Sequence, residues 1–452
     1  DGSIYCSLEQ HTLSDVENSL IKARSAFNEW SRLSLAQRVQ YVTNFVAAIE
    51  GEKEAIAEEI TWQMGRPLSQ SPWEVNGFVD RANYMLGIAE SSLAPYQPDE
   101  MDGFDRWIDH EPLGVVAVLS PWNYPFLTSV NAIVPALVAG NAVILKHSFQ
   151  TPLVAERYLK AAEKAGIPNG VFQILHLDHE KTAVLTGHNL VDGVFFTGSV
   201  EGGFAVQKSL NNKFITCGLE LGGKDPAYVR ADADLDYAVN NLVDGSFFNS
   251  GQSCCGIERI YVHENLYDPF VDGFVELTKK YVLGNPIDAT TSLGPMVKTS
   301  AADFVRKQID AATRSGAKAL VDESLFHASK KGTPYLAPQV LVNVDHTMDV
   351  MSEESFGPVV GIMKVSSDEE AVRLMNDSKY GLTASLWTED IEEARNVGRS
   401  VQTGTLFLNR CDYLDPALAW TGVKNTGRGV TLSRLGYQHV TRPKSYHFKI
   451  KK

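Results

Sequence analysis

The sequence predicts an α/β fold built on parallel β-sheet. Short β-rich runs begin at residue 113, for example at 113–119 and 142–145, and helical patterns at 125–138 and 151–165 separate them. Strands that alternate with helices of this length form βαβ units, in which the strands run parallel. Ligands of such sheets bind just beyond the carboxyl ends of the strands, so the residues after each run are the candidates for function.

The flanking regions extend this pattern. Helices are expected over the first hundred residues, because Ser14 to Glu17 and Ser34 to Gln37 have the capping-box form, in which the serine oxygen accepts a backbone N–H. A second α/β segment is expected to begin near Asp225. The remaining strands are expected at 171–175, 191–196 and 214–216, and the remaining helices at 199–210, 232–248, 266–281, 300–315 and 369–377.

Composition and charge exclude several classes of function. The 452 residues are 44% hydrophobic and 21% charged, which is typical of globular domains. Forty-one basic and 55 acidic residues give a net charge of −14, and because such a surface repels phosphates, no nucleic-acid partner is expected. The most apolar stretch, 132–145, is shorter than the roughly 18 residues that span a bilayer, so no membrane span is expected.

The cysteines indicate a reducing compartment. Their odd number and irregular spacing do not suit a disulfide framework, so a cytoplasmic location is expected. No metal site is expected either, because no histidine or further cysteine pair lies at ligand spacing from the adjacent thiols at 254 and 255. The five cysteines are Cys6, Cys217, Cys254, Cys255 and Cys411.

Two segments carry candidate chemistry. The strand expected at 191–196 leads into Gly198, Ser199 and a helix, and the free N–H groups of such a helix start can bind a phosphate; the same segment is also an ordinary turn with a helix cap. Cys254 lies in a polar turn flanked by Gly251 and Gly256, where a thiol is reachable as a nucleophile. The alternative is that it packs as a small hydrophobic residue.

Four polar residues at expected strand ends or turns are ambiguous when taken singly. Glu220, set between leucines, is either a general base with a raised pKa or a surface charge. Asn123 either offers its amide to a developing oxyanion or makes a turn. Lys146 pairs with a ligand hydroxyl or phosphate, or points to solvent, and Glu354 is equally open.

Taken together, six segments in chain order resemble the motifs of the aldehyde dehydrogenase superfamily. The resemblance covers nearly the whole chain, and an ordered set of this size makes a chance match very improbable. The segments are Pro-Trp-Asn-Tyr-Pro (121–125), Phe-Thr-Gly-Ser (196–199), Leu-Glu-Leu-Gly-Gly-Lys (219–224), Gly-Gln-Ser-Cys (251–254), Glu-Ser-Phe-Gly-Pro (354–358) and Gly-Val-Lys-Asn-Thr-Gly (422–427).

The resemblance implies NAD(P)-dependent oxidation of an aldehyde to a carboxylic acid. By this similarity Cys254 attacks the aldehyde to give a thiohemiacetal, whose oxyanion the Asn123 side chain and the Cys254 N–H hold. Loss of hydride gives a thioester, and Glu220 activates the water that hydrolyses it. Members that pass the acyl group to coenzyme A lack this glutamate, so hydrolysis is expected.

Cofactor contacts carry over in the same way. Phe149 departs from the pattern, because NAD-preferring relatives often have a glutamate there, whose charge repels the 2′-phosphate of NADP. NAD is the expected cofactor, with NADP allowed. The implied contacts are Gly198 and Ser199 at the pyrophosphate, Lys146 and Glu354 at the ribose hydroxyls, Trp122 near the cofactor pocket and Phe356 near the nicotinamide.

The implied substrate tunnel has aromatic walls and few charges, which suits a medium-sized apolar or aromatic aldehyde. Against this, Arg410 in the variable loop suggests a succinate-semialdehyde or related semialdehyde dehydrogenase, while Asp412 and Asp415 oppose that idea. A non-catalytic structural or binding protein on this fold is a remote alternative. The tunnel residues are Tyr124, Asn131, Phe248, Ser253, Leu414 and Trp420.

The family's architecture, carried over, divides the chain into three parts. A Rossmann-like cofactor domain is expected at 1–98 and 112–224, and an α/β catalytic domain at 225–430. The remaining segments, 99–111 and 431–452, are expected to form a small β oligomerisation element, in which residues 104–110 pair with 445–450 in half-buried strands. A homodimer or homotetramer is therefore expected.

Overall fold

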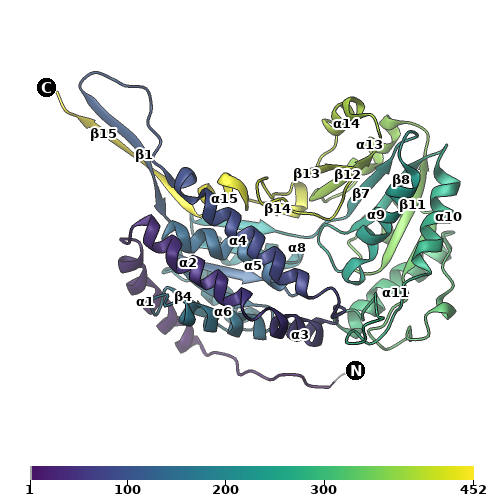
Figure 1. Cartoon of the computed structure of the whole chain (residues 1–452), viewed down its shortest axis with the longest axis horizontal. Helices are drawn as coiled ribbons and strands as arrows, with labels where there is room; N and C mark the ends of the chain where they lie inside the picture. The colour runs from purple at the N-terminus through teal and green to yellow at the C-terminus, as the bar shows by residue number, and fades with distance from the viewer. Residues whose placement is uncertain (1–2, 452) are drawn as a thin grey trace.

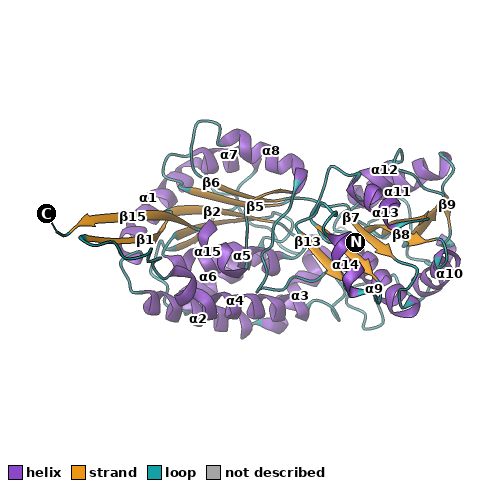
Figure 2. Ribbon diagram, turned by 90° about the horizontal axis from the view of Figure 1, so that it is seen from above, coloured by secondary structure: helices purple, strands orange, loops and turns teal. Residues whose placement is uncertain are grey.

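The computed structural model describes residues 3–451, which form two α/β bodies side by side and a projecting two-stranded ribbon (Figures 1 and 2). Four helices come first: α1 (Leu13–Trp30), α2 (Leu35–Glu50), α3 (Lys53–Met64) and α4 (Pro72–Leu93). The capping box predicted at Ser34 is confirmed, with Gln37 as its partner. The box predicted at Ser14 is wrong, because Thr12 and Asp15 cap the first helix instead.

The first body is built on a six-stranded sheet with the order β14-β6-β5-β2-β3-β4. Five of these strands are parallel. The sixth, β14, comes last in the sequence and pairs antiparallel with β6. The strands are β2 (Val115–Ser120), β3 (Ala142–His147), β4 (Phe172–Ile174), β5 (Gly193–Thr197), β6 (Thr216–Glu220) and β14 (Gly427–Arg428). The connecting helices are α5 (Pro125–Ala139), α6 (Leu153–Lys164), α7 (His179–Gly187) and α8 (Val200–Ser209).

Helices cover both faces of this sheet. Figure 2 shows α1, α7 and α8 on one side and α2, α4, α5 and α6 on the other. The strand residues alternate between these two layers: Val115 and Ala117 pack in the core with α1, and Val116 and Val118 in the core with α5. Strand β2 is buried along its whole length, as a central parallel strand must be.

One strand prediction in this body is wrong. The run at 214–216 was expected to be a strand, but β6 begins only at Thr216, and the Phe214 side chain is fully exposed. Gly218 weakens the strand signal of the true segment, in which Cys217 and Leu219 are buried. The consequence is that Glu220 is the last residue of the strand and stands at its carboxyl end.

The second body contains a seven-stranded sheet with the order β13-β12-β7-β8-β11-β10-β9, parallel except for β9. Its strands are β7 (Asp225–Val229), β8 (Ile257–His263), β9 (Lys318–Ala319), β10 (Gln339–Val342), β11 (Val359–Val365), β12 (Thr383–Trp387) and β13 (Thr405–Leu408). Its α-helices are α9 (Leu235–Phe247), α10 (Tyr267–Thr278), α11 (Thr299–Arg314), α12 (Asp349–Ser352), α13 (Asp368–Asn376) and α14 (Ile391–Gly398). The four helices predicted in this region are confirmed to within a few residues at each end. Short 3₁₀ turns are η1 (Phe248–Gly251), η2 (Glu323–Leu325) and η3 (Lys424–Thr426).

The ribbon pairs β1 (Phe104–Pro112) with β15 (Thr441–Lys449) in antiparallel register, from Phe104 opposite Lys449 to Pro112 opposite Thr441. It follows α15 (Ser433–His439) and extends away from the first body in Figure 1. Trp107 and Tyr446 stack across it with ring centroids 4.3 Å apart. No helix within residues 3–451 has the length and apolar character needed to cross a membrane.

Candidate active site

A cavity of about 390 Å³ opens at the carboxyl end of β6. Its walls come from α4, the start of α5, the end of α9 and the loop that follows β13. Cys254 and Glu220 both line it. So do all six residues predicted for the substrate tunnel: Tyr124, Asn131, Phe248, Ser253, Leu414 and Trp420.

Cys254 lies in the loop between η1 and β8. The turn before it holds Asn249 and Ser250 in the left-handed region, at φ 52° and 57°. Gly251 continues at φ 70°, and a Cβ there would lie 2.3 Å from the Gly357 carbonyl oxygen, so only glycine fits. This chain reversal leaves Cys254 half-buried at the cavity wall.

The neighbouring thiol is in a different environment. Cys255 is 3% exposed, and its Sγ donates to Asp412 Oδ1 at 2.9 Å. The hydrogen bond with Cys254, burial and the nearby Asp412 carboxylate together raise the pKa of the Cys255 thiol well above its ordinary value. Because the thiolate is the reactive form, Cys255 is poorly suited to be the nucleophile.

Glu220 faces the same cavity. Its carboxylate accepts hydrogen bonds from Thr431 Oγ1 at 2.5 Å and Thr197 Oγ1 at 3.1 Å. Burial raises the pKa of Glu220, and the two threonine hydroxyls oppose that rise. A carboxylate with a raised pKa is a stronger base than an exposed one, which suits proton abstraction from water.

Asn123 lies in the loop between β2 and α5 and is 4% exposed. Its Nδ2 donates to the Gln252 carbonyl oxygen at 3.2 Å, two residues before Cys254. Asn123 is not among the residues that line the cavity of Cys254 and Glu220. The structure therefore brings its amide to the nucleophile loop, behind the cavity wall.

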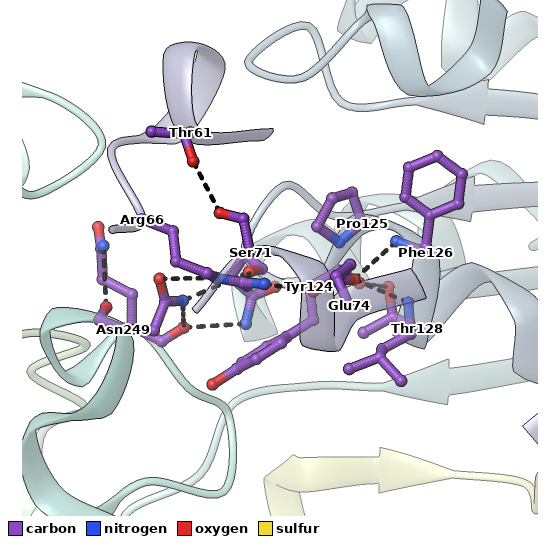
Figure 3. Close-up of polar contacts among 12 residues, drawn as sticks. Thr61, Arg66, Ser71, Glu74, Tyr124, Pro125, Phe126, Thr128 and Asn249 are labelled. Carbon is purple, nitrogen blue, oxygen red and sulfur yellow. Dashed lines mark hydrogen bonds and ion pairs between the residues drawn. The ribbon is translucent and has the colours of Figure 1, made fainter. Parts of the chain in front are cut away.

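A buried ion pair fixes the backbone at this point. Arg66 Nη1 lies 2.5 Å from Glu74 Oε2, and the same guanidinium donates to the Asn123 carbonyl oxygen and to Asn249 Oδ1 (Figure 3). Glu74 Oε1 accepts the backbone N–H of Phe126 and of the next residue, each at 2.9 Å, at the start of α5. This ion pair was not predicted from the sequence. Arg66 precedes α4 and Glu74 lies in its first turn. Two charged residues at these positions produce no periodic sequence pattern that would indicate their burial.

The phosphate-site prediction falls on the start of α8. Ser199 caps this helix, with its Oγ accepting the Gly202 N–H at 3.1 Å, as predicted. A Cβ at Gly198 would lie 2.5 Å from Cζ of Phe196, so a larger residue there would have to displace that ring. Lys146 lies in β3, and burial lowers the pKa of its ammonium group.

Trp122, Glu354 and Phe356 line a second cavity of about 310 Å³, together with Gln252. The rings of Trp122 and Phe356 meet edge to face with centroids 5.6 Å apart. Glu354 Oε1 accepts the Gly223 N–H at 3.0 Å, and burial, followed by the charge of Glu258, raises the pKa of Glu354 to about 8. The structure thus brings three of the six predicted cofactor residues into one cavity, whereas Lys146, Gly198 and Ser199 do not line it.

The expectation of few charges in the tunnel is wrong. Arg66, Glu74, Arg81 and Asp412 all line the cavity that holds Cys254. Glu74 and Arg81 are there because α4, which was not expected at the tunnel, forms one of its walls. Arg410 is not among the lining residues. Its side chain is exposed, and its guanidinium lies 3.4 Å from the centre of the Tyr413 ring.

Residues 1–446 match the model of the aldehyde dehydrogenase family. The chain belongs to this family. An aldehyde dehydrogenase from Paenarthrobacter nicotinovorans is 33% identical over 442 residues, which cover 97% of this chain and 96% of that protein. The enzyme described here is therefore an NAD(P)-dependent aldehyde dehydrogenase, and the predicted family and fold class are confirmed.

Solved structures of relatives share the fold. Betaine aldehyde dehydrogenase from Staphylococcus aureus in complex with NAD+ is 30% identical, with a TM-score of 0.94 over 100% of this chain and 90% of that chain. An Escherichia coli structure described as an NADP-dependent enzyme is 25% identical, with a TM-score of 0.95 over 99% and 93% of the two chains. Relatives of this aldehyde dehydrogenase thus include both NAD and NADP enzymes.

Proposed function

We propose that this aldehyde dehydrogenase oxidises its substrate through a covalent bond to Cys254 and releases the acid by hydrolysis. The observation that carries the proposal is that Cys254 and Glu220 line one cavity. Cys255, the alternative thiol, is buried and hydrogen-bonded to Asp412. A reachable thiol and a partly buried carboxylate in one cavity provide a nucleophile for the carbonyl carbon and a base for water.

In the first step the Cys254 sulfur attacks the aldehyde carbon, and the carbonyl oxygen becomes the oxyanion of a thiohemiacetal. We assign the Asn123 amide and the Cys254 backbone N–H to hold that oxyanion. Support comes from the contacts around Asn123: the Gln252 carbonyl holds its amide and Arg66 holds its backbone oxygen, so the donor is preorganised.

In the last step the thioester on Cys254 is hydrolysed. Glu220 takes a proton from water, the hydroxide oxygen bonds to the acyl carbon, and the carbon–sulfur bond breaks to return the thiolate. Thr431 and Thr197 hold the carboxylate from two sides, which keeps it pointed at the cavity. Removing either hydroxyl is expected to weaken this orientation.

The residues present fit a nicotinamide dinucleotide. Glu354 Oε2 receives no hydrogen bond from residues 3–451, so it is free to accept one from a ribose hydroxyl, while Trp122 and Phe356 offer an aromatic wall. Gly198 and Ser199 lie at a helix start suited to the pyrophosphate, and Lys146 to the other ribose. When bound, the cofactor supplies the hydride acceptor.

The proposed route is tested by following reduced-nicotinamide absorbance with aliphatic, aromatic and carboxylated aldehydes, with and without coenzyme A. The expected result is turnover that is independent of coenzyme A and yields one free acid for each reduced cofactor. Turnover that requires coenzyme A would contradict hydrolysis by Glu220.

Cofactor preference is expected to depend on residue 149. We propose NAD as the main cofactor with NADP accepted, because Phe149, two residues beyond β3, is 71% exposed and supplies no charge toward the adenosine ribose. Phe149→Glu is expected to lower kcat/KM with NADP by about tenfold relative to NAD, since a carboxylate there repels the 2′-phosphate. Phe149→Gln is the uncharged control, and an equal ratio in both variants would contradict the assignment.

We also propose that residues 1–98 and 112–224 form the cofactor domain and that 99–111 and 431–452 join two or four copies. The catalytic domain is proposed to begin at 225, but it ends before the predicted residue 430, because β14 (Gly427–Arg428) pairs with β6 in the sheet of the first body. The projecting ribbon supports the proposed joining of copies. Phe448 on β15 and Ile450 just after it are exposed, and a two-stranded sheet has two unpaired edges that a second copy can cover. A cytoplasmic location fits the five free cysteines.

A further inference from the structure

Arg81 is a buried cation in the wall of the substrate cavity. It lies on α4, is 8% exposed and lines the same cavity as Cys254 and Glu220. Its Nη1 donates to the Leu127 carbonyl oxygen and to Asn131 Oδ1 at 3.4 Å, both on α5. These two contacts orient the guanidinium along the start of that helix.

The other nitrogens of this guanidinium are not used in hydrogen bonds. Within residues 3–451 neither Nε nor Nη2 donates one, and Arg81 lines the cavity. Two carboxylates, Glu74 and Glu220, act on it only through space, because Glu74 is paired with Arg66 and Glu220 accepts from two threonine hydroxyls. A buried charge with no carboxylate in direct contact is costly, so an arginine of this kind in a ligand cavity is a site for an anion.

A second donor lies beside it. Asn131 is 3% exposed and lines the cavity, and Arg81 holds its Oδ1. Its Nδ2 donates to no acceptor in the described part of the chain, which leaves this amide group free for a ligand. A guanidinium edge and an adjacent amide N–H together match the two oxygens of a carboxylate.

We infer that Arg81, assisted by Asn131, binds a carboxylate at the far end of the aldehyde substrate. The preferred substrates are then ω-carboxylated aldehydes, and the products are dicarboxylates. This assignment rests on the proposed function of the cavity and moves the recognition of the carboxylate from Arg410, which lies outside the cavity, to α4.

The other charges of the cavity have other roles or positions. Asp412 Oδ1 accepts hydrogen bonds from Ser253 at 3.0 Å and from Cys255, so it is tied to the nucleophile loop. Asp80 and Asp244 line the cavity from exposed positions. These two carboxylates favour a cationic substrate instead. The experiment must therefore compare an anionic with a cationic aldehyde.

The test compares kcat/KM for three aldehydes in the wild type, Arg81→Met and Arg81→Lys. The aldehydes are 4-oxobutanoate, its uncharged analogue 4-oxobutanamide and the cationic betaine aldehyde. The wild type is expected to prefer the carboxylate over the amide by at least about tenfold, and Arg81→Met to lose that preference mainly through KM. Arg81→Lys is expected to recover part of it, because the charge returns without the fork geometry.

Two matched variants guard against a trivial loss of structure. Arg410→Met removes the nearby exposed arginine and should leave the preference intact. Asn131→Asp keeps the size of the side chain but sets a carboxylate against Arg81, so it should lower the preference as Arg81→Met does. Binding of butanedioate by calorimetry, weakened about tenfold in Arg81→Met, reports on the site without turnover.

Three results would each overturn the role of Arg81. They are a preference for the carboxylate that survives in Arg81→Met, an equal loss of kcat/KM for all three aldehydes in that variant, and a wild type that prefers betaine aldehyde. Turnover of 4-oxobutanamide by the wild type keeps the proposed function in place in all of these cases. Absence of turnover with every aldehyde, with butanedioate still bound through Arg81, would overturn the proposed function alone.

Discussion

Cys254→Ala is expected to lower kcat/KM for aldehyde oxidation by at least about a thousandfold, because the variant has no atom that can form the covalent bond to the carbonyl carbon. The fold should be unaffected, since the side chain is half-buried at a cavity wall and the turn before it is set by Asn249, Ser250 and Gly251. The measurement is the initial rate of reduced-nicotinamide formation, with the thermal unfolding midpoint as a check on folding.

The other cysteines are the controls for that result. Cys255→Ser keeps a donor toward Asp412 and is expected to retain turnover within about tenfold. Cys6→Ser, far from the cavity in sequence and absent from its lining, should behave as the wild type. If Cys255→Ser loses as much activity as Cys254→Ala, the assignment of the nucleophile is wrong.

Glu220→Gln is expected to lower kcat by about a hundredfold to ten-thousandfold while sparing the first half of the reaction. The amide preserves the size of the side chain and a contact with Thr431, but it cannot take a proton from water. Rapid mixing should therefore show a burst of about one reduced cofactor per active site, followed by slow turnover. A slow phase without a burst would show that Glu220 acts in the formation of the thioester and not in its hydrolysis.

The same residue sets the acid limb of the pH profile. Burial raises the pKa of Glu220 above its ordinary value of about 4.3, and the base works only when ionised, so hydrolysis is lost as the pH falls through the raised pKa. The Thr431 hydroxyl stabilises the carboxylate. Thr431→Val should therefore move the acid limb to higher pH, and a shift to lower pH would contradict this role.

Much of the site could be predicted from the sequence because its residues occupy strand ends and turns. Gly198 and Ser199 follow β5, and Glu220 ends β6. Such residues can be recognised in the sequence, because the local backbone conformation itself requires a glycine or a helix-capping residue at these positions. The failed strand prediction at 214–216 shows the limit: the strand residue Gly218 weakens the pattern that would have identified the true strand.

The charge of the cavity could not be predicted. Arg66, Glu74 and Arg81 belong to the helical N-terminal region, more than 100 residues before the nucleophile, and only the packing of α4 against α5 brings them to it. Arg410, in contrast, is close to the tunnel residues in the sequence, but its side chain is exposed. Tertiary contacts between distant helices leave no local pattern, so the variable walls of the cavity depend on the structure.

The most direct test of the account is the mass of the covalent species in Glu220→Gln after mixing with cofactor and one aldehyde. The account predicts an intact mass increased by that of the aldehyde less the hydride and the thiol proton, with the acyl group on the peptide that contains Cys254. An unmodified protein that has nonetheless formed reduced cofactor, or an acyl group located on Cys255, would contradict it.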